Sequence, residues 1–440
     1  MIRKHFAGFV ASALALAVSA QAFAGTVTTD GTDIVIKTKS GLEVSTTDKQ
    51  YSFKLGGRIQ ADYDTFDGFY TKDNNTADAS YFRRAILELS GNYKDWNYVF
   101  NYDFGNGGST NWDQATIAYA GFNPVNIMVG RFDPDFGLQH ATSSKWITAI
   151  ERSAIYDIGG WVNEKEDDMG VQVNGTAGGM FYGSTSIVQQ KPSGNTNQSD
   201  SGKNVNTFNL RGVVAPILSE TEVLHLGLDF AQRSYDDDKY QGKIESRLQV
   251  RGVTEEGNNN SNSGKILFGG TNANRFYSDD QVFGAEFAYM NGPFSLESEY
   301  LKRTLSGQDA NGDRDATGYN AQIAYTLTGE SRSYKLDGGK FDKIKPTSKN
   351  GAWEVFYRYD NIKVEDGDGL TGAINTSSLQ TSKANINTIG VNWYANEAVK
   401  VSLDYLMTKT DDDTVDLNNR AADASDDSGN AVTARLQYVF

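Results

Sequence analysis

The chain closes on the stretch Arg435-Leu-Gln-Tyr-Val-Phe440, in which apolar Leu436, Tyr438 and Phe440 alternate with other residues. Alternation with a period of two places the apolar side chains on one face of a β-strand. The same pattern runs through Phe53–Tyr63 near the other end of the chain. Both stretches therefore predict strands with one apolar and one polar face.

The N-terminus has the features of an export signal. Arg3 and Lys4 precede the short apolar stretch Phe6–Ala20, and Ala22-Phe23-Ala24 has the small–x–small form cut by signal peptidase. We expect residues 1–24 to be a signal peptide, because the apolar stretch is too short to span a bilayer. Together with the aromatic terminal strand, this resembles a bacterial outer-membrane β-barrel, and implies an all-β, transmembrane antiparallel barrel in the outer membrane of a Gram-negative bacterium.

Beyond residue 50 the chain divides into about sixteen strand-like segments of the length that crosses a membrane at a tilt. Sixteen strands leave an aqueous channel rather than a filled interior, so we expect a pore. The predicted strands are 52–65, 80–93, 97–106, 112–121, 125–133, 168–177, 180–190, 205–216, 221–235, 280–290, 294–304, 316–327, 351–364, 385–394, 399–410 and 430–440.

The connections between these segments alternate between short turns and long polar loops, as in barrels with periplasmic turns and external loops. We therefore expect residues 25–51 to form an N-terminal segment on the periplasmic side and residues 52–440 to form one barrel domain. One connection breaks the rule, because Thr328–Asn350 is long but falls on the periplasmic side.

Composition excludes several classes of protein. The 440 residues include no cysteine, which excludes a disulfide scaffold and cysteine-based zinc or redox sites. The formal net charge of −15 argues against nucleic acid as a partner. Acidic clusters such as Asp236–Asp238 lack the spacing of an EF-hand and are expected to be exposed loops, so no cofactor or metal is expected.

The connection Pro134–Asp167 is too apolar for a loop in water, since it holds Trp146, Ile147, Ile150 and Ile158 among others. We expect it to fold inward, pack against the inner wall and constrict the channel. It also carries hydrogen-bond donors suited to an oxyanion such as phosphate, namely Ser143, Ser144, Lys145 and Arg152. The alternative is that Arg152 pairs with Glu151 or with a carboxylate of the wall.

Several long motifs resemble the phosphate-selective porin O and P family. They are Gly25-Thr-Val-Thr-Thr-Asp-Gly31, Phe53-Lys-Leu-Gly-Gly-Arg58, Tyr81-Phe-Arg-Arg-Ala85, Gly121-Phe-Asn-Pro-Val125, Ala141-Thr-Ser-Ser-Lys-Trp146 and Val391-Asn-Trp-Tyr-Ala-Asn-Glu-Ala398. The resemblance covers nearly the whole chain. It implies a homotrimer of sixteen-stranded barrels, each with an anion site near mid-channel that is reached past arginines on the outer side and lysines on the periplasmic side.

The resemblance implies a central site made of Arg83, Arg84, Asp113, Ser143, Ser144 and Arg152, with His140 beside it. Strand parity qualifies this set, because adjacent Arg83 and Arg84 should point to opposite faces. Arg84 shares a face with Glu88 and is predicted to lie in the lumen. Arg83 shares a face with Leu87 and reaches the channel only near the strand's end or through a bulge. Asp113 would accept a hydrogen bond from a protonated anion.

The basic paths on either side of this site also follow from the resemblance. The outer path would use the loop Asp236–Asp279, folded inward, and the cations Arg58, Lys243, Arg247, Arg251 and Lys265. The periplasmic path would use Lys37, Lys39, Lys49, Lys54, Lys340, Lys343 and Lys345. Closely spaced basic groups lower the barrier to an anion and pass it along by several weak sites.

The chain departs from the family pattern at positions that matter for selectivity. His140 and Asn97 stand where the family has lysines, and Glu245 interrupts the outer arginine row, so we expect weaker anion binding than with the full set. Ile86 and Asp133 fall where the phosphate-preferring form has tyrosines. Less tyrosine bulk widens the constriction, which favours pyrophosphate or short polyphosphate over orthophosphate.

The sequence thus predicts an anion-selective outer-membrane porin for passive uptake of phosphate-type anions, in contact with outer-membrane lipid and lipopolysaccharide. A general or carboxylate-selective porin is the alternative. An enzyme is not expected, because residues 25–440 contain only two histidines, His140 and His225, and no Gly-x-Ser-x-Gly element.

Overall fold

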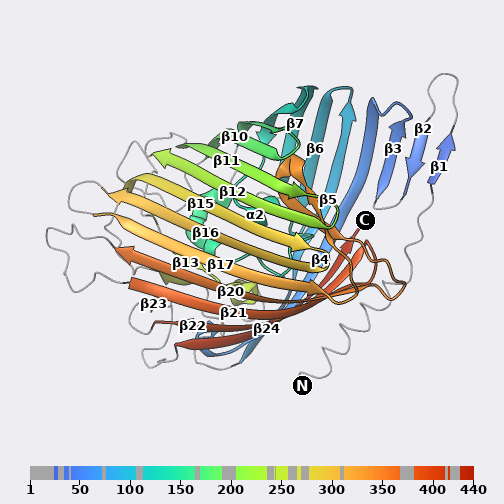
Figure 1. The fold of residues 1–440 in the computed structure, drawn as a ribbon. Helices are drawn as coiled ribbons and strands as arrows, with labels where there is room; N and C mark the ends of the chain where they lie inside the picture. Colours follow the sequence, from blue (N-terminus) through green and yellow to red (C-terminus); the bar gives the residue numbers. More distant parts are fainter. Residues whose placement is uncertain are drawn as a thin grey trace.

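Sixteen antiparallel strands form a closed barrel in the described part of the computed structural model (Figure 1). The structure describes residues 24–27, 34–38, 41–71, 76–105, 112–163, 169–190, 205–234, 242, 244–255, 265–268, 277–307, 312–366, 381–411, 415–416 and 427–440. The barrel strands are β4 (Tyr51–Phe66), β5 (Ala77–Tyr93), β6 (Trp96–Asp103), β7 (Trp112–Phe122), β8 (Val125–Arg131), β9 (Met169–Ala177), β10 (Phe181–Gln190), β11 (Val205–Leu218), β12 (Glu222–Ser234), β15 (Tyr277–Asn291), β16 (Phe294–Gly307), β17 (Arg314–Thr326), β20 (Ala352–Asp366), β21 (Thr381–Tyr394), β22 (Val399–Thr410) and β24 (Ser428–Val439).

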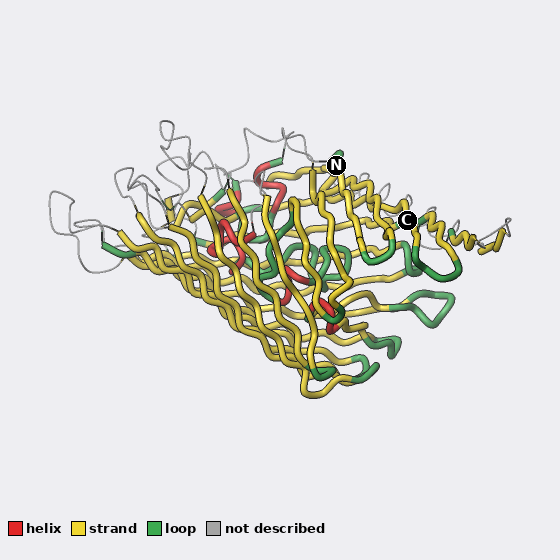
Figure 2. The backbone as a smooth tube through the Cα atoms, turned by 90° about the horizontal axis from the view of Figure 1, so that it is seen from above, coloured by secondary structure: helices red, strands yellow, loops and turns green. Residues whose placement is uncertain are grey.

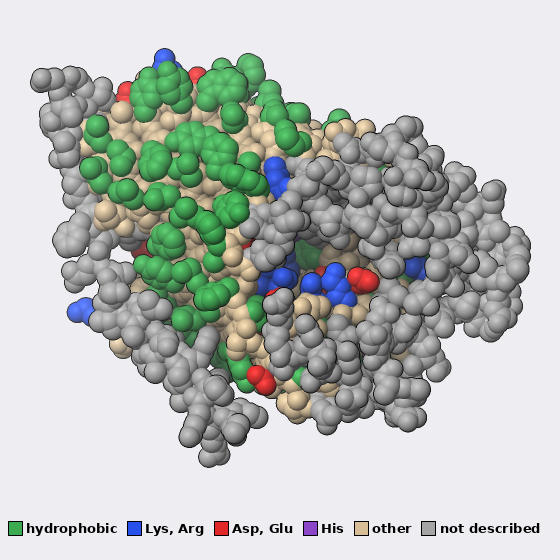
Figure 3. Space-filling view, turned by 180° about the vertical axis from the view of Figure 1, so that it is seen from behind, with side chains coloured by type: hydrophobic (Ala, Val, Ile, Leu, Met, Phe, Trp, Pro, Cys, Tyr) green, Lys and Arg blue, Asp and Glu red, His purple; other side chains and the backbone are tan. Residues whose placement is uncertain are grey.

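These strands confirm the sixteen segments predicted from alternation. The largest difference is at Thr381, where β21 begins four residues before the predicted start. Side chains alternate as expected for a barrel in lipid: on β11, Leu210 is 47% exposed on the outside whereas its neighbour Arg211 is completely buried inside. Figure 3 shows the resulting cover of hydrophobic side chains on the outer wall.

The terminal strand closes the barrel, as its aromatic alternation suggested. β24 pairs with β4 from Ala431 opposite Phe66 to Val439 opposite Arg58. Beyond that point the N–H of Phe440 donates to the carbonyl of Gly57 at 3.1 Å, and the N–H of Gly57 donates to the carbonyl of Phe440 at 2.9 Å. Closure satisfies the backbone groups that an open sheet edge would expose to hydrocarbon.

Three short strands precede the barrel: β1 (Ala24–Val27), β2 (Ile34–Lys37) and β3 (Leu42–Thr46). β3 pairs with β4 at Ser52–Leu55, next to the place where β24 ends, so the sheet continues beyond the barrel wall at the end with the short turns (Figure 1). Residues 1–23 of the predicted signal peptide lie outside the described residues. No helix in the described ranges is long and apolar enough to cross a membrane.

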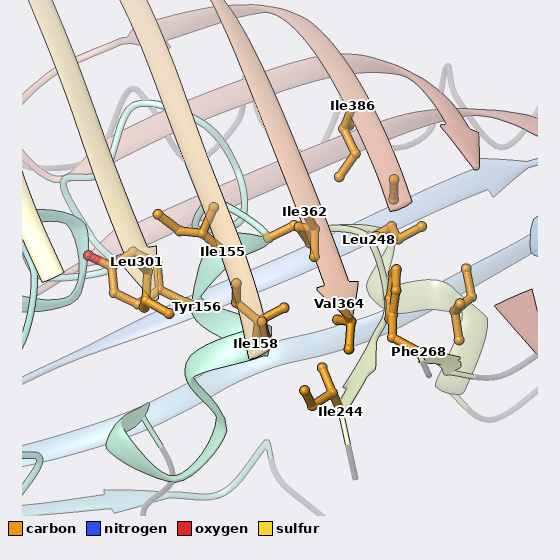
Figure 4. Close-up of a cluster of buried hydrophobic side chains, with 14 of the residues drawn as sticks. Ile155, Tyr156, Ile158, Ile244, Leu248, Phe268, Leu301, Ile362, Val364 and Ile386 are labelled. Atoms are coloured by element: carbon orange, nitrogen blue, oxygen red, sulfur yellow. The ribbon is translucent and has the colours of Figure 1, made fainter. Parts of the chain in front are cut away.

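The connection between β8 and β9 folds into the barrel, which confirms the predicted constriction loop. Its described part holds α2 (Leu138–Ala141), α3 (Ile155–Gly159) and η2 (Gly160–Asn163), and Figure 2 shows these helices inside the ring of strands. In Figure 4, Ile155 and Ile158 of α3 pack with Leu301 of β16 and Ile362 of β20. The protein thus has an apolar core within its lumen, which includes residues of the wall strands from β11 round through β24 to β4 and β5.

An outer loop completes this core. The described parts of the connection between β12 and β15 are β13 (Ile244–Ser246), η3 (Arg251–Thr254) and β14 (Ile266–Phe268), and β14 also pairs with β23 (Val415–Asp416). Leu248 and Phe268 of this connection are completely buried beside α3 (Figure 4). The N–H of Gly252 donates to Asp64 of β4 at 2.7 Å. The predicted inward fold of this loop is therefore confirmed.

The long periplasmic connection 328–350 also turns into the barrel. It forms a hairpin of β18 (Arg332–Lys335), η5 (Leu336–Gly338) and β19 (Lys340–Ile344). Arg211 of β11 donates to the carbonyls of Gly338 and Gly339 at 2.9 and 2.8 Å. Gly339 adopts φ 52°, a left-handed conformation that favours glycine, where it packs against the wall. η1 (Gly68–Tyr70) follows β4 at the external end.

Candidate functional site

Basic side chains of the wall hold the constriction loop in place. They donate hydrogen bonds to backbone carbonyls of the loop, which in a water-exposed loop would bind water instead. The pairs are Arg303 to Ile158, Arg358 to Glu151, Arg435 to Ile150 and Lys400 to Ile147. Each of the three arginines is also bonded to a wall carboxylate, Asp280, Asp360 and Asp62 respectively. Because their charges are cancelled within the wall, these arginines are structural.

A β-bulge brings two adjacent arginines to the lumen. In the register of β4 and β5, Gln60 is opposite Arg84 and the next residue, Ala61, is opposite Phe82, so that Arg83 has no partner on β4. The extra residue lets Arg83 and Arg84 face the same side, whereas Phe82 points outward. The sequence analysis allowed Arg83 to reach the channel only near the strand's end or through a bulge, and the structure has the bulge.

Arg83 is held by a carboxylate of the constriction loop. Its Nε and Nη2 donate to the two oxygens of Glu151 at 2.7 and 3.1 Å, and Nη2 of Arg435 donates to the same carboxylate at 2.7 Å. Burial alone would raise the pKa of Glu151, but Arg83 and Arg435 outweigh burial and hold this pKa well below its usual range. Glu151 is therefore ionised and cancels much of the charge of Arg83.

Arg152 does not pair with Glu151 in the way that the alternative interpretation suggested. Its guanidinium donates to three carbonyls of its own loop, those of Gln139 at 2.9 Å and of His140 and Thr142 at 3.3 Å. Burial lowers the pKa of Arg152, and the negative charge of Asp133 is the largest influence in the opposite direction. Carbonyls orient the guanidinium but leave its formal charge in place.

Arg84 is the least engaged of these arginines, because it has no hydrogen-bond or ion-pair partner among the residues that the structure describes. Its charge interacts repulsively with those of Arg83, Arg58 and Arg152, and attractively with that of Glu151. A guanidinium held among like charges favours an added anion.

These side chains line one cavity of about 680 Å³, within the range of small-ligand sites. Of the predicted residues it brings together Arg58, Arg83, Arg84, Asp113, Asp133, His140, Ser143, Ser144, Arg152, Arg247, Arg251 and Lys340. Nη1 of Arg58 donates to Oγ of Ser143 at 3.3 Å. Ile86, proposed as a selectivity residue, is buried in the wall and is not among the residues lining this cavity.

His140 and Asp133 lie against each other at one side of the cavity. Nε2 of His140 is 3.8 Å from a carboxylate oxygen of Asp133, and the imidazole stacks on the ring of Tyr156 with 6.1 Å between centroids. The hydroxyl of Tyr156 in turn hydrogen-bonds to Glu299 of β16. Two of the departures from the family pattern, His140 and Asp133, are therefore in contact with each other.

The outer path is only partly assembled. Arg247 and Arg251 line the cavity, but Arg251 pairs with Glu255 at 2.8 Å. Lys265 is exposed and lies 3.6 Å from Glu245, the acidic residue expected to interrupt this row. Lys243 lies outside the described residues.

The periplasmic path is also less continuous than predicted. Lys340 lines the cavity, and Lys54 is close enough to Lys145 for their charges to repel. Lys37 pairs with Glu43 on the strands outside the barrel, and Lys343 pairs with Glu397, both at 2.7 Å. The lysines at 49 and 345 are exposed, and the one at 39 lies outside the described residues.

The site residues predicted from the sequence did not include Lys145 or most of the carboxylates that line the cavity. Lys145 lines the cavity 3.9 Å from Glu88, and was noted only as a donor of its loop. Among the described lining residues there are eight carboxylates and eight arginines or lysines. Figure 3 shows basic and acidic side chains together in the hollow of the molecule. Alternation predicts that wall carboxylates face inward, but not which of them reach the open channel.

Comparisons with known proteins agree with this architecture. The family model described as "Phosphate-selective porin O and P" matches residues 53–440. Porin O of Pseudomonas aeruginosa is 54% identical over 451 aligned positions that cover both chains completely. Among solved structures, Pseudomonas putida OprB is 11% identical with a TM-score of 0.55, over 89% of this chain and 95% of its own. A trimer form of Vibrio cholerae OmpT is 11% identical with a TM-score of 0.51, over 89% of this chain and 99% of its own.

The two solved structures share the barrel fold with this chain, but their sequence identity to it is too low to indicate a common function. The family model and the full-length relative go further, because the model matches most of the chain and the relative is 54% identical over the whole length of both proteins. The chain therefore belongs to the phosphate-selective porin O and P family and is an outer-membrane β-barrel channel rather than an enzyme.

Proposed function

We propose that this channel carries phosphate-type anions by diffusion and holds them in passage at Arg84, Arg152, Ser143 and Ser144. The observation that carries the proposal is that Arg84 lacks a carboxylate partner among the described residues while it lines the cavity with Arg152 and both serines. Of the other arginines that line the cavity, Arg83 and Arg251 are bonded to carboxylates. The positive potential available to an anion therefore comes mainly from Arg84 and Arg152, with Arg58 and Arg247 beside them.

The constriction loop gives this site its geometry. Arg152 is oriented by three carbonyls, and Ser144 is fixed through its own carbonyl, which accepts from Gln60 of β4 at 3.3 Å. Donors that are oriented before the anion arrives lose little conformational entropy when it binds. Because each contact is exchangeable, the anion can also leave, as a channel requires.

The size and donor number of the cavity favour pyrophosphate or short polyphosphate over orthophosphate. Arg58 and Lys145 line the same cavity as Arg84 and Arg152, so two phosphoryl groups of one solute would each meet cations. The family resemblance places tyrosines of the phosphate-preferring form at positions 86 and 133. Because Ile86 is buried in the wall and Asp133 lines the cavity, Asp133 is the replacement that would leave more room at the constriction.

We further propose that three copies associate in the outer membrane, in contact with lipid and lipopolysaccharide. The family resemblance supports the trimer. Exposed aromatic side chains such as Trp96, Phe104 and Trp112 on the outer wall are suited to lipid or to a neighbouring barrel.

Conductance in planar bilayers tests the function. Across a KCl gradient the reversal potential should lie on the chloride side, and added phosphate should block the chloride current. Pyrophosphate should block at a lower concentration than phosphate. A cation-sided reversal potential with no block by either anion would reject the proposal in favour of a general porin.

A further inference from the structure

The lumen face of β5, β6 and β7 carries a patch of hydrogen-bond acceptors that anion transport alone does not use. Glu88, Asn101 and Gln114 are consecutive cross-strand partners, so their side chains lie in one row across three strands. Asp103 shares a face with Asn101, and all four residues line the cavity together with Asp113. We refer to these five residues as the acceptor patch.

One member of the acceptor patch has no hydrogen-bond donor among the residues that the structure describes. Asn101 is only 9% exposed, and its Oδ1 is buried without a hydrogen-bond partner in the described part of the chain. A buried carbonyl oxygen without a donor is unfavourable, because it has lost its hydrogen bonds to water and gained none in the protein. This cost makes a solute N–H group favourable at this position, between the carboxylate of Glu88 and the amide of Gln114.

Two carboxylates of the patch, those of Glu88 and Asp103, keep the capacity to accept a hydrogen bond. Glu88 has Lys145 as its nearest cation at 3.9 Å, which is longer than a hydrogen bond. Asp103 uses one oxygen, Oδ1, to accept the N–H groups of Ala85 and Gly105, both at 2.9 Å. The charge of Arg58 interacts with the carboxylates at 88, 103 and 113 together, so one arginine faces three acids.

The acceptor patch and the cationic donors meet at the β5 bulge. Asp103 accepts from the backbone of Ala85, the residue that directly follows Arg84. A short solute could therefore contact a guanidinium with one end and a carboxylate with the other. Such a pair of opposite poles in one cavity is complementary to a dipolar solute rather than to a simple anion.

We propose that the channel admits zwitterionic phosphorylated solutes, that is, short phosphate monoesters or phosphonates that carry a primary ammonium group. The phosphoryl group lies at Arg84 and Arg152, and the ammonium group donates to Glu88, Asn101 and Asp103. This inference rests on the proposed phosphate site, because the phosphoryl end uses the same donors.

Block of the chloride current in planar bilayers by matched probes tests the proposal. The probes are 2-aminoethyl phosphate and 2-hydroxyethyl phosphate, which differ only in the terminal ammonium or hydroxyl group. If cations alone governed binding, the zwitterion would block less well, because its net negative charge is smaller. We expect it to block at a concentration lower by about tenfold or more, as one charge-assisted hydrogen bond would give.

Variants of the patch should change this preference in opposite directions. The preference is measured as the half-blocking concentration of 2-hydroxyethyl phosphate divided by that of 2-aminoethyl phosphate. Glu88→Gln keeps the shape of the side chain and removes its charge, and should bring this ratio to about one. Asn101→Asp adds a charge at the orphaned oxygen and should increase the ratio. Glu222→Gln is the matched control, since Glu222 bonds to Tyr289 near the periplasmic end of β12, is not among the cavity-lining residues, and should leave the ratio unchanged.

The outcomes separate this inference from the proposed function. Block by inorganic phosphate without a preference for the zwitterion would overturn the inference and leave the function intact. No block by inorganic phosphate would reject the function itself. Equal block by ethanolamine, which lacks the phosphoryl group, would also overturn the inference, because the patch would then be a plain cation site. A preference unchanged in both Glu88→Gln and Asn101→Asp would exclude the acceptor patch as its source.

Discussion

Arg83 donates two hydrogen bonds to the carboxylate of Glu151, at 2.7 and 3.1 Å, whereas Arg84 beside it has no such partner among the described residues. Two neighbours in sequence thus have different roles. The bulge turns both arginines into the lumen, and the constriction loop binds Arg83, whereas Arg84 is the arginine that we propose for the solute. A count of lumen arginines would overestimate the charge that an anion meets.

Removal of the charge on Glu151 should strengthen anion binding. In Glu151→Gln the charge of Arg83 is no longer cancelled, and one charge a few ångströms away is worth about 1 kcal/mol, or roughly fivefold in affinity. The phosphate concentration for half-block of the chloride current should fall by that factor. Glu222→Gln, which removes a carboxylate outside the cavity, is the control, and an equal shift there would mean a general charge effect.

Loss of the wall anchor at Arg435 should loosen the constriction. Arg435 bonds Asp62, Glu151 and the carbonyl of Ile150, so Arg435→Met leaves two buried carboxylates without this cation. Breaking a buried ion pair from one side costs about 3–5 kcal/mol, and we expect a lower melting temperature in detergent together with a larger single-channel conductance.

The matched control for this anchor is Lys409→Met. Lys409 is exposed and lies 3.4 Å from Asp427, an ion pair of the kind worth about 0–1 kcal/mol. Its melting temperature and conductance should stay close to those of the parent protein. An Arg435→Met barrel with unchanged conductance would mean that other contacts suffice to hold the loop.

Alkaline pH should weaken phosphate block through Lys145. Burial lowers the pKa of Lys145 below its usual value of about 10.4, and Glu88 opposes this only in part. As the pH rises towards the usual lysine range, Lys145 therefore loses its positive charge earlier than exposed lysines do, while phosphate stays a dianion. Lys145→Arg should retain block over this range, because arginine stays protonated. If phosphate block depended on pH in the same way in the parent protein and in Lys145→Arg, Lys145 would not take part in anion binding.

The sequence predicted the barrel well because each strand is an independent, repeated pattern. Alternation located all sixteen strands, and the apolar residues at 147, 150 and 158 showed that the loop after β8 packs on the wall. The inward turn of the hairpin β18–β19 was not foreseen, because it depends on contacts such as Arg211 to Gly338, which join strands far apart in the chain.

The candidate site was predicted less completely, for a physical reason. Residue type shows that Arg83 can bind an anion, but its partner Glu151 comes from a loop whose position depends on the whole wall. The bulge at Arg83 depends likewise on the register between β4 and β5. The orphaned oxygen of Asn101 leaves no trace in the sequence, since an asparagine facing the lumen of a barrel is ordinary.

The most direct test of this account compares phosphate block in Arg84→Gln and Arg83→Gln under identical conditions. Both variants remove one positive charge, so their long-range effects are matched. Arg84→Gln should raise the half-blocking concentration by well over tenfold, because a charge-assisted hydrogen bond is lost together with the charge, and Arg83→Gln by about fivefold, the effect of one charge alone. An equal or larger effect at Arg83 would contradict the account, because the arginine bound to Glu151 would then be the one that holds the anion.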